Sequence, residues 1–265
     1  MDKKKICLVI PSLQAGGMER VMSELANYFI GQEQVEIHLV LYGKNPAIFY
    51  PLNHNIKVYQ PKFKFNDTLR TFSTLKRLFY LRKTVRLIQP DTVLSFGEYW
   101  NNFALLAFLG LKIPIYVSDR CQPDKSLGLL HDKLRKWLYP KAAVVVVQTD
   151  KAREIYRLIV PNEKIHVIGN PIRKIHQSKA IAKEKIILMV SRIITTKHHD
   201  RLISIFSKLD APDWKLVIVG GEALKQKHFN NLKDLANHLG IAKRVMFEGE
   251  QKNVEDYYLK SSIFA

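Results

Sequence analysis

The stretch MVSRIITTKHHDRLISIFSKL at residues 189–209 is followed by KLVIVGGEALKQ at 215–226 and by HLGIAKRVMFEGEQKNVEDYYLKSSIFA at 238–265. Each stretch contains a short apolar run of strand length, then a polar or glycine-rich loop, and then a segment whose apolar residues recur at the spacing of a helix. Strands that alternate with helices predict βαβ units and a parallel sheet. Ligands of such sheets bind at the carboxyl ends of the strands, so the residues just after each strand are the functional candidates.

The same alternation extends upstream, so an α/β fold is predicted for the whole chain. Predicted strands span residues 6–10, 35–41, 56–59, 92–95, 113–118, 143–148, 165–168, 186–190, 215–219 and 245–248, and residues 262–265 resemble the start of another. Predicted helices span residues 18–29, 69–88, 101–109, 125–138, 200–208, 224–239 and 254–260, with one more after Thr149 or Asp150, either of which can cap it.

A candidate linker divides the alternation into two halves. Gly169 and Asn170 precede a proline and a Lys-rich polar stretch at residues 173–185, and 265 residues suffice for two domains. We therefore predict two doubly wound parallel-sheet domains, residues 1–170 and 171–265, with a ligand cleft between them. No apolar run reaches 18 residues, and the first apolar stretch is too short for a signal peptide. With Cys7 expected as a buried thiol inside a strand, we expect a cytoplasmic chain.

The net charge of +18, from 42 Lys and Arg against 24 Asp and Glu, favours an anionic partner. Nucleic acid, an anionic membrane or an anionic small substrate each fit, as does a basic surface without a partner. Residues 62–86 carry eight basic residues and one acid, interleaved with aromatic and aliphatic side chains. This mixture predicts an interfacial helix on an anionic membrane, with contacts from Lys76, Arg77, Arg82 and Lys83. A packed helix with a solvated basic face is the alternative, and no nucleic-acid-binding module accompanies the segment.

Two glycine-containing loops follow strands. Gly16 and Gly17 directly precede the first predicted helix, where backbone N–H groups can bind phosphate, although a tight turn without a ligand has the same pattern. Gly220 follows the strand at 215–219 and is expected to let the backbone pass close to a ligand. Neither loop matches the Walker or the dinucleotide-binding pattern.

Polar or charged side chains stand at the ends of three further strands. Arg192 and Lys197 come after the strand at 186–190, where a guanidinium and an ammonium suit a diphosphate. Ser95 ends the strand at 92–95, and Asp119 and Arg120 follow the strand at 113–118. Arg120 can bind a phosphate, whereas Asp119 can act as a base or pair with Arg120. The adjacent His198 and His199 point in different directions on a helix start, so no metal site is predicted.

These motifs together resemble the GT-B glycosyltransferases of family 4, along essentially the whole chain. GGMER at 16–20, SF at 95–96, SDR at 118–120, GNP at 169–171 and the SR…K frame at 191–197 recur in the family's order. The basic helix and SDRCQ most resemble bacterial enzymes that extend lipid-linked glycans or polysaccharides, lipopolysaccharide included.

The resemblance implies a retaining transfer of a hexose or N-acetylhexosamine from a UDP-sugar to a lipid-linked or polysaccharide acceptor, without a cofactor or bound metal. It assigns the donor phosphates and nucleotide to Gly16, Gly17, Arg192, Lys197, Gly220 and Gln251. The acceptor side falls to Glu19, Arg20, Ser95 and Asn170, and catalysis to Asp119 and Arg120. In the family the end of the strand predicted here at 113–118 often carries an acidic residue and then a His near the acceptor; this chain has Asp119 and then Arg120, so an arginine stands where that His is expected. The implied partners are the nucleotide-sugar, the acceptor and an anionic membrane on its cytoplasmic face, and not nucleic acid.

The family's acidic donor motif is expected after the last predicted strand, which begins at residue 262. We therefore expect the chain to stop short of a complete donor domain and to be a poor or inactive transferase by itself. Two alternatives remain open: a non-catalytic protein that binds acceptor or membrane, and a GT-B sugar-nucleotide epimerase.

Overall fold

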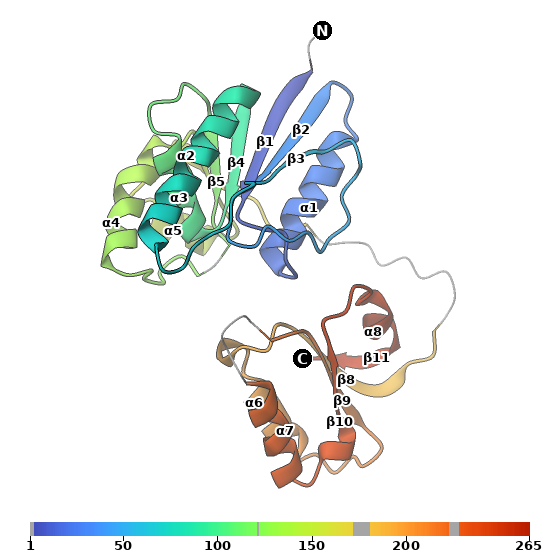
Figure 1. The fold of residues 1–265 in the computed structure, drawn as a ribbon. Coiled ribbons are helices and arrows are strands. Elements are labelled where there is room, and N and C mark those ends of the chain that lie inside the picture. The colour runs from blue at the N-terminus through green and yellow to red at the C-terminus, as the bar shows by residue number, and fades with distance from the viewer. Residues whose placement is uncertain (1–2, 121, 172–180, 223–227) are drawn as a thin grey trace. The chain divides into compact units, whose positions relative to one another are not determined.

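The computed structural model describes residues 3–120, 122–171, 181–222 and 228–265. The chain divides into two compact units, Met1–Ile172 (unit 1) and Arg173–Ala265 (unit 2), each built on its own parallel sheet (Figure 1). The change from unit 1 to unit 2 falls within the predicted linker, of which residues 172–180 lie outside the described residues. Among the described helices, none has both the length and the apolar character needed to cross a membrane.

Unit 1 is a seven-stranded sheet in the order β3-β2-β1-β4-β5-β6-β7, and every strand pair is parallel. Its strands are β1 Lys4–Ile10, β2 Val35–Leu41, β3 Lys57–Tyr59, β4 Thr92–Phe96, β5 Ile115–Ser118, β6 Val144–Val147 and β7 Ile165–Val167. Its helices are α1 Gly17–Ile30, α2 Arg70–Ile88, α3 Glu98–Ala107, α4 Leu129–Leu138 and α5 Asp150–Tyr156, with 3-10 turns at Tyr139–Lys141 and Asn162–Lys164. The strand order reverses between β1 and β4, so the loops that follow these strands lie at the position where open α/β sheets bind ligands.

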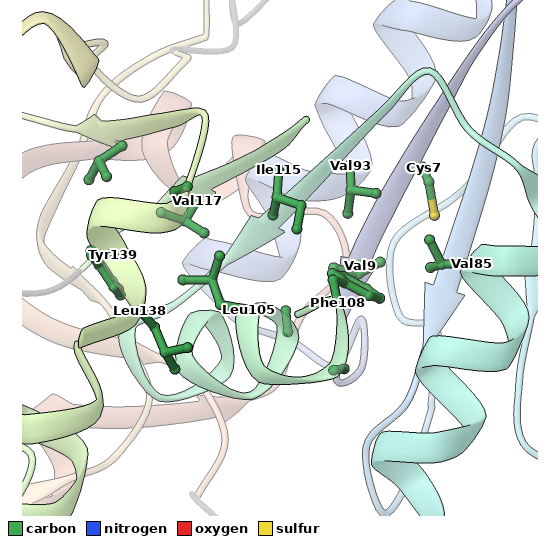
Figure 2. Close-up of a cluster of buried hydrophobic side chains, with 14 of the residues drawn as sticks. Cys7, Val9, Val85, Val93, Leu105, Phe108, Ile115, Val117, Leu138 and Tyr139 are labelled. Atoms are coloured by element: carbon green, nitrogen blue, oxygen red, sulfur yellow. The ribbon is translucent and has the colours of Figure 1, made fainter. Parts of the chain in front are cut away.

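Both faces of this sheet are buried, because successive side chains of a strand point to opposite faces. Cys7 and Val9 of β1 pack with residues of α2, α3, α4 and α5, and Figure 2 shows part of this cluster. Leu8 and Ile10, on the other face, pack against α1. Cys7 is a free, fully buried thiol, as predicted, and burial raises its pKa.

Unit 2 contains a four-stranded parallel sheet in the order β10-β9-β8-β11. Its elements are β8 Glu184–Val190, α6 His199–Phe206, β9 Lys215–Val219, α7 Phe229–His238, β10 Val245–Gly249, α8 Glu255–Lys260 and β11 Ser261–Phe264, with 3-10 turns at Thr195–Lys197 and Ala242–Arg244. Helices α6 and α7 cover one face, and Tyr257 and Tyr258 of α8 cover the other. The predicted α/β class with two doubly wound parallel sheets is therefore confirmed.

Some helix bounds differ from the prediction. The segment predicted as helical from residue 125 becomes a helix only at Leu129, because Asp132 reaches back to the Ser126 hydroxyl and the Leu127 N–H and holds them in a turn that ends at Gly128. Helix α3 begins three residues earlier than predicted, directly after Gly97. Helix α7 begins at Phe229, and residues 224–227 of its predicted start lie outside the described residues.

Candidate functional site

The glycine loop after β1 is held from the side by a tyrosine. The Tyr50 hydroxyl accepts a hydrogen bond from the Gly16 N–H and donates one to the Gly16 carbonyl, both at 3.0 Å. The Gly16 N–H is therefore already used within the protein. A Cβ added at Gly17 would meet nothing within 4 Å, whereas one at Gly16 would lie 2.2 Å from the Glu19 carboxylate. Gly17 thus presents open, exposed backbone at the first residue of α1.

The carboxylate of Asp119 lies buried at the end of β5. Its Oδ1 accepts hydrogen bonds from the Tyr139 hydroxyl at 2.6 Å and from Asn101 Nδ2 at 2.8 Å. Its Oδ2 has no hydrogen-bond partner among the described residues. Burial, and secondarily the charge of Glu98, raises the pKa of Asp119 to about 7. This carboxyl can therefore take up or release a proton near neutral pH.

Arg120 links the ends of three strands. Its backbone N–H donates to Glu98 Oε1 at 2.8 Å, and its guanidinium lies 4.1 Å from the centre of the Phe96 ring. The guanidinium also donates to Asn170 Oδ1, which accepts a second hydrogen bond from Gln148 Nε2 at 2.9 Å. Burial lowers the pKa of Arg120 to about 10, so the side chain remains a cation at neutral pH.

A pocket of about 350 Å³ adjoins these side chains at the carboxyl ends of β5 and β6. It is lined by Asp119, Arg120, Gln122, Pro123, Val147, Gln148, Thr149, Ala152 and Tyr156. Thr149 also caps α5, as predicted, through its side-chain oxygen and the Ala152 N–H. Sequence reasoning therefore found Asp119, Arg120 and Asn170, which the structure brings together. It missed Tyr139, Tyr156 and Asn101, which come from helices and carry no local motif.

The remaining predicted acceptor-side residues lie apart from this pocket. Glu19 and Arg20 are half-buried in the first turn of α1. Ser95 is fully buried in β4, and a ligand could reach its hydroxyl only if the neighbouring chain moved.

In unit 2, Arg192 and Lys197 are exposed on the loop between β8 and α6. The Ser191 and Ile193 N–H groups donate to the Val219 and Gly221 carbonyls, both at 2.9 Å, and so fix this loop against the loop after β9. His199 is buried, and its Nε2 lies 3.0 Å from the Ser191 hydroxyl. The two cations therefore extend from a loop that is held at several points.

Glycine is required at Gly220 by the protein itself. Its φ is +148°, and a Cβ there would lie 1.9 Å from the Ser191 carbonyl oxygen. The close approach that the structure shows is to the backbone of the loop between β8 and α6, and a close approach to a ligand stays a prediction. Gln251 is half-buried, and its side-chain amide donates to the Glu248 carbonyl at 2.7 Å. Among the described residues, no three His, Cys, Asp or Glu side chains come together as metal ligands would.

The predicted membrane contact of Arg77 is wrong. Arg77 is buried, and its guanidinium donates to the carbonyls of Tyr42, Gly43 and Phe63, so it anchors α2 to the sheet. Arg82 is half-buried and donates to the Ala107 and Leu109 carbonyls at the end of α3, at 2.7 and 2.8 Å.

Lys76 and Lys83 are exposed on α2, as the prediction required. Phe72 and Phe79, which are 66% and 64% exposed, and Leu75 accompany them on this helix. We call these five residues the α2 outer face.

Residues 15–174 match the family described as Glycosyltransferase Family 4, and residues 171–265 match the family described as Glycosyl transferases group 1. The chain belongs to glycosyltransferase family 4. This family-4 glycosyltransferase has the GT-B fold, which its solved structural neighbours share.

Two curated relatives and one solved structure illustrate the similarity. The GalNAc-alpha-(1->4)-GalNAc-alpha-(1->3)-diNAcBac-PP-undecaprenol alpha-1,4-N-acetyl-D-galactosaminyltransferase of Campylobacter jejuni is 28% identical over 98% of this chain and 71% of that protein. The amylovoran biosynthesis glycosyltransferase AmsD of Erwinia amylovora is 24% identical over 98% of this chain and 73% of that protein. Anabaena HepE, solved in complex with UDP and glucose, superposes with a TM-score of 0.77 at 15% identity, over 98% of this chain and 73% of that one.

Proposed function

We propose that this family-4 glycosyltransferase transfers a hexose or N-acetylhexosamine from a UDP-sugar to a lipid-linked or polysaccharide acceptor, with retention at the anomeric carbon. The observation that carries the proposal is the loop between β8 and α6, which presents the exposed Arg192 and Lys197 and is hydrogen-bonded to the loop that contains Gly220. The Campylobacter relative's name, which specifies an undecaprenol-linked acceptor, supports the acceptor class. The UDP in the HepE complex supports the donor class. The retaining outcome is taken from the family resemblance.

The donor site, in this proposal, neutralises a diphosphate with two cations of unit 2 and has no need of a bound metal. Arg192 supplies a planar fork for two phosphate oxygens, and Lys197 supplies a point charge. Both also stabilise the charge that develops on the departing nucleoside diphosphate. The loop that carries them is held by Ser191, Ile193 and the buried His199, so little ordering is required when the nucleotide binds.

The acceptor side belongs to unit 1. Gly17 offers open backbone at the start of α1, where N–H groups favour an anion. Arg120 remains cationic and, with Asn170, suits a phosphate or saccharide oxygen. Asp119, with its pKa near 7, can accept or return a proton close to the reacting hydroxyl. No enzymic nucleophile is needed where the incoming hydroxyl attacks on the face from which the nucleotide departs.

The membrane contact, in this proposal, is the α2 outer face, which binds an anionic leaflet from the cytoplasmic side. Two lysines among exposed aromatic and aliphatic side chains are the combination that interfacial helices use. Each lysine near an anionic leaflet contributes roughly 1 kcal/mol, so the attachment is reversible.

Calorimetric titration with UDP tests the donor site. Arg192→Ala and Lys197→Ala should each weaken UDP binding by about 1.5–3 kcal/mol, roughly tenfold to a hundredfold, as the loss of charge-assisted hydrogen bonds does. Arg201→Ala, an exposed arginine of α6, is the matched control and should bind UDP as the parent does. Unchanged affinity in both variants would remove the donor assignment. A product that forms from UDP-sugar without any acceptor would indicate an epimerase.

A further inference from the structure

We propose that His199 is a positioning residue of the donor site, which fixes Arg192 relative to Lys197 through hydrogen bonds to Ser191 and Ile194. The inference rests on the proposed function, because it takes the binding of a diphosphate by the two cations as given. His199 is only 2% exposed, so its side chain acts on the ligand through the loop and not by direct contact.

The backbone on either side of Arg192 is tied to the end of the neighbouring strand β9. The Ser191 N–H donates to the Val219 carbonyl and the Ile193 N–H donates to the Gly221 carbonyl, both at 2.9 Å. The Ile193 side chain is also buried in the core of unit 2. The point from which the Arg192 side chain extends is therefore fixed by the sheet.

Lys197 stands further along the loop, at the end of the 3-10 turn Thr195–Lys197. Its N–H donates to the Ile194 carbonyl at 3.0 Å, and the next residue, His198, has a left-handed backbone with φ of +53°. Each residue between Ile193 and Lys197 adds two soft backbone torsions. The hydrogen bonds that fix the backbone at Arg192 therefore do not by themselves fix the turn that carries Lys197.

The imidazole of His199 joins these two parts of the loop. Its Nε2 lies 3.0 Å from the Ser191 hydroxyl. Burial lowers the pKa of His199, and the charge of Asp200 and a hydrogen bond between the ring and the Ile194 backbone oppose this shift. A hydrogen bond that raises the pKa of a histidine is one that the ring donates, so Nδ1 donates to the Ile194 carbonyl. This is the carbonyl that also accepts from Lys197, so one buried ring connects Ser191 to the turn.

The connection matters because a diphosphate needs both cations at once. Arg192 and Lys197 have long, exposed side chains, so the loop can control only the two backbone positions from which they extend. A loop that holds these positions before the nucleotide arrives loses little conformational entropy on binding. Without the imidazole, part of that ordering has to take place when the nucleotide binds. The affinity for UDP should therefore fall, although no atom that touches the nucleotide has changed.

Substitutions at the two ends of the Ser191–His199 contact measure its effect on UDP binding by calorimetric titration of the full chain. His199→Phe keeps a buried aromatic ring and removes both hydrogen bonds, so UDP should bind about threefold to tenfold more weakly. Ser191→Ala removes only the hydroxyl and should weaken binding about twofold to threefold. His199→Asn places an amide N–H near the position of Nδ1, keeps the contact to Ile194, and should recover most of the affinity that His199→Phe loses.

Two controls separate positioning from a general loosening of unit 2. The double variant Ser191→Ala/His199→Phe should bind UDP no more weakly than His199→Phe alone, because the hydroxyl acts through the imidazole. Ile241→Val truncates the core of unit 2 directly before the turn Ala242–Arg244, at the amino ends of the parallel strands and away from the loop. This variant should lower the thermal midpoint and leave UDP affinity at the parental value.

Parental UDP affinity in His199→Phe, an equal loss in Ile241→Val, or additive losses in the double variant would overturn the positioning role. If His199→Phe does not fold, parental affinity in Ser191→Ala overturns it instead. The Arg192→Ala and Lys197→Ala variants separate the two proposals. Weaker UDP binding in these two variants, together with parental affinity in Ser191→Ala and His199→Phe, refutes the positioning role alone. A parent chain that does not bind UDP refutes the donor assignment, and the positioning role with it.

Discussion

Asp119→Asn should make the stability of unit 1 less dependent on pH. In the folded protein burial raises the pKa of Asp119 from 3.8 to about 7, whereas the unfolded chain keeps the ordinary value. Below pH 4 both states are protonated. Between pH 4 and 7 the unfolded chain releases its proton before the folded one does, so the free energy of unfolding falls as the pH rises. Well above pH 7 both states are ionised, and the free energy of unfolding no longer changes with the titration of Asp119.

The magnitude follows from the same pKa values. One pKa unit corresponds to about 1.4 kcal/mol, so the full loss between pH 4 and 8 is at most about 4 kcal/mol. Asparagine does not titrate and keeps an Oδ1 that can accept from Tyr139 and Asn101. The difference in unfolding free energy between the variant and the parent should therefore grow in the variant's favour by about 2–4 kcal/mol from pH 4 to 8. Any effect of the substitution on the free energy of unfolding that does not depend on pH cancels, because only the change between pH 4 and 8 is compared.

Urea unfolding followed by tryptophan fluorescence measures this difference. A Trp214→Phe background leaves Trp100 and Trp137 as the tryptophans, both in unit 1, so the signal reports that unit. Other titrating groups, such as His38 and its lowered pKa, affect both proteins equally. If the two proteins keep a constant difference from pH 4 to 8, the Asp119 carboxyl is not held protonated by its surroundings and the reasoning fails.

Four further predictions each test a single feature of unit 1 or unit 2. Gly17→Val should abolish transfer without lowering the thermal midpoint, because the new side chain enters open space, and a folded, active variant would contradict this. Gly220→Ala should instead destabilise unit 2 by several kcal/mol in denaturant unfolding, because its Cβ would lie 1.9 Å from a backbone oxygen. His198→Gly should stabilise unit 2 by about 0.5–1 kcal/mol in denaturant unfolding, since His198 has φ of +53°, and an unchanged or lower midpoint would count against strain at this residue. Reversal of Lys76 and Lys83 to Glu should lower flotation with anionic vesicles at least tenfold at low salt and leave neutral vesicles unaffected, whereas equal binding to both vesicle types would exclude an electrostatic anchor.

The order of strands and helices could be predicted because its signals are local. The apolar run at residues 143–148 became β6, and the alternation of Cys7 and Leu8 between two clusters follows from the period of two along a strand. The order β3-β2-β1-β4 could not be predicted from these patterns, because strand pairing joins segments far apart in the chain. The late start of α4 was missed because Asp132, inside the helix, holds the turn before it.

The candidate site also contains residues that local sequence signals predict and residues that only the folded structure reveals. Arg192, Lys197, Asp119 and Arg120 could be placed because functional groups of α/β sheets follow strands. Tyr139 and Asn101 could not, because their hydrogen bonds to Asp119 join residues that lie far apart in the chain. A contact of this kind is a property of the folded structure and has no counterpart in the composition of a sequence window.

Helix α2 shows why the charged and apolar residues of a sequence segment do not by themselves predict which side chains the folded protein exposes. Residues 62–86, which include most of α2, carry eight basic residues, yet Arg77 is buried and the large aromatic side chains of Phe72 and Phe79 are exposed. The cause is the backbone: the carbonyls of Tyr42, Gly43 and Phe63 need donors, and the long guanidinium of Arg77 supplies them. This arrangement removes a charge from the surface and adds aromatic area to it. The electrostatic part of any membrane attachment is therefore smaller than the charge count implies, and the apolar part is larger, so vesicle binding should persist in part at high salt.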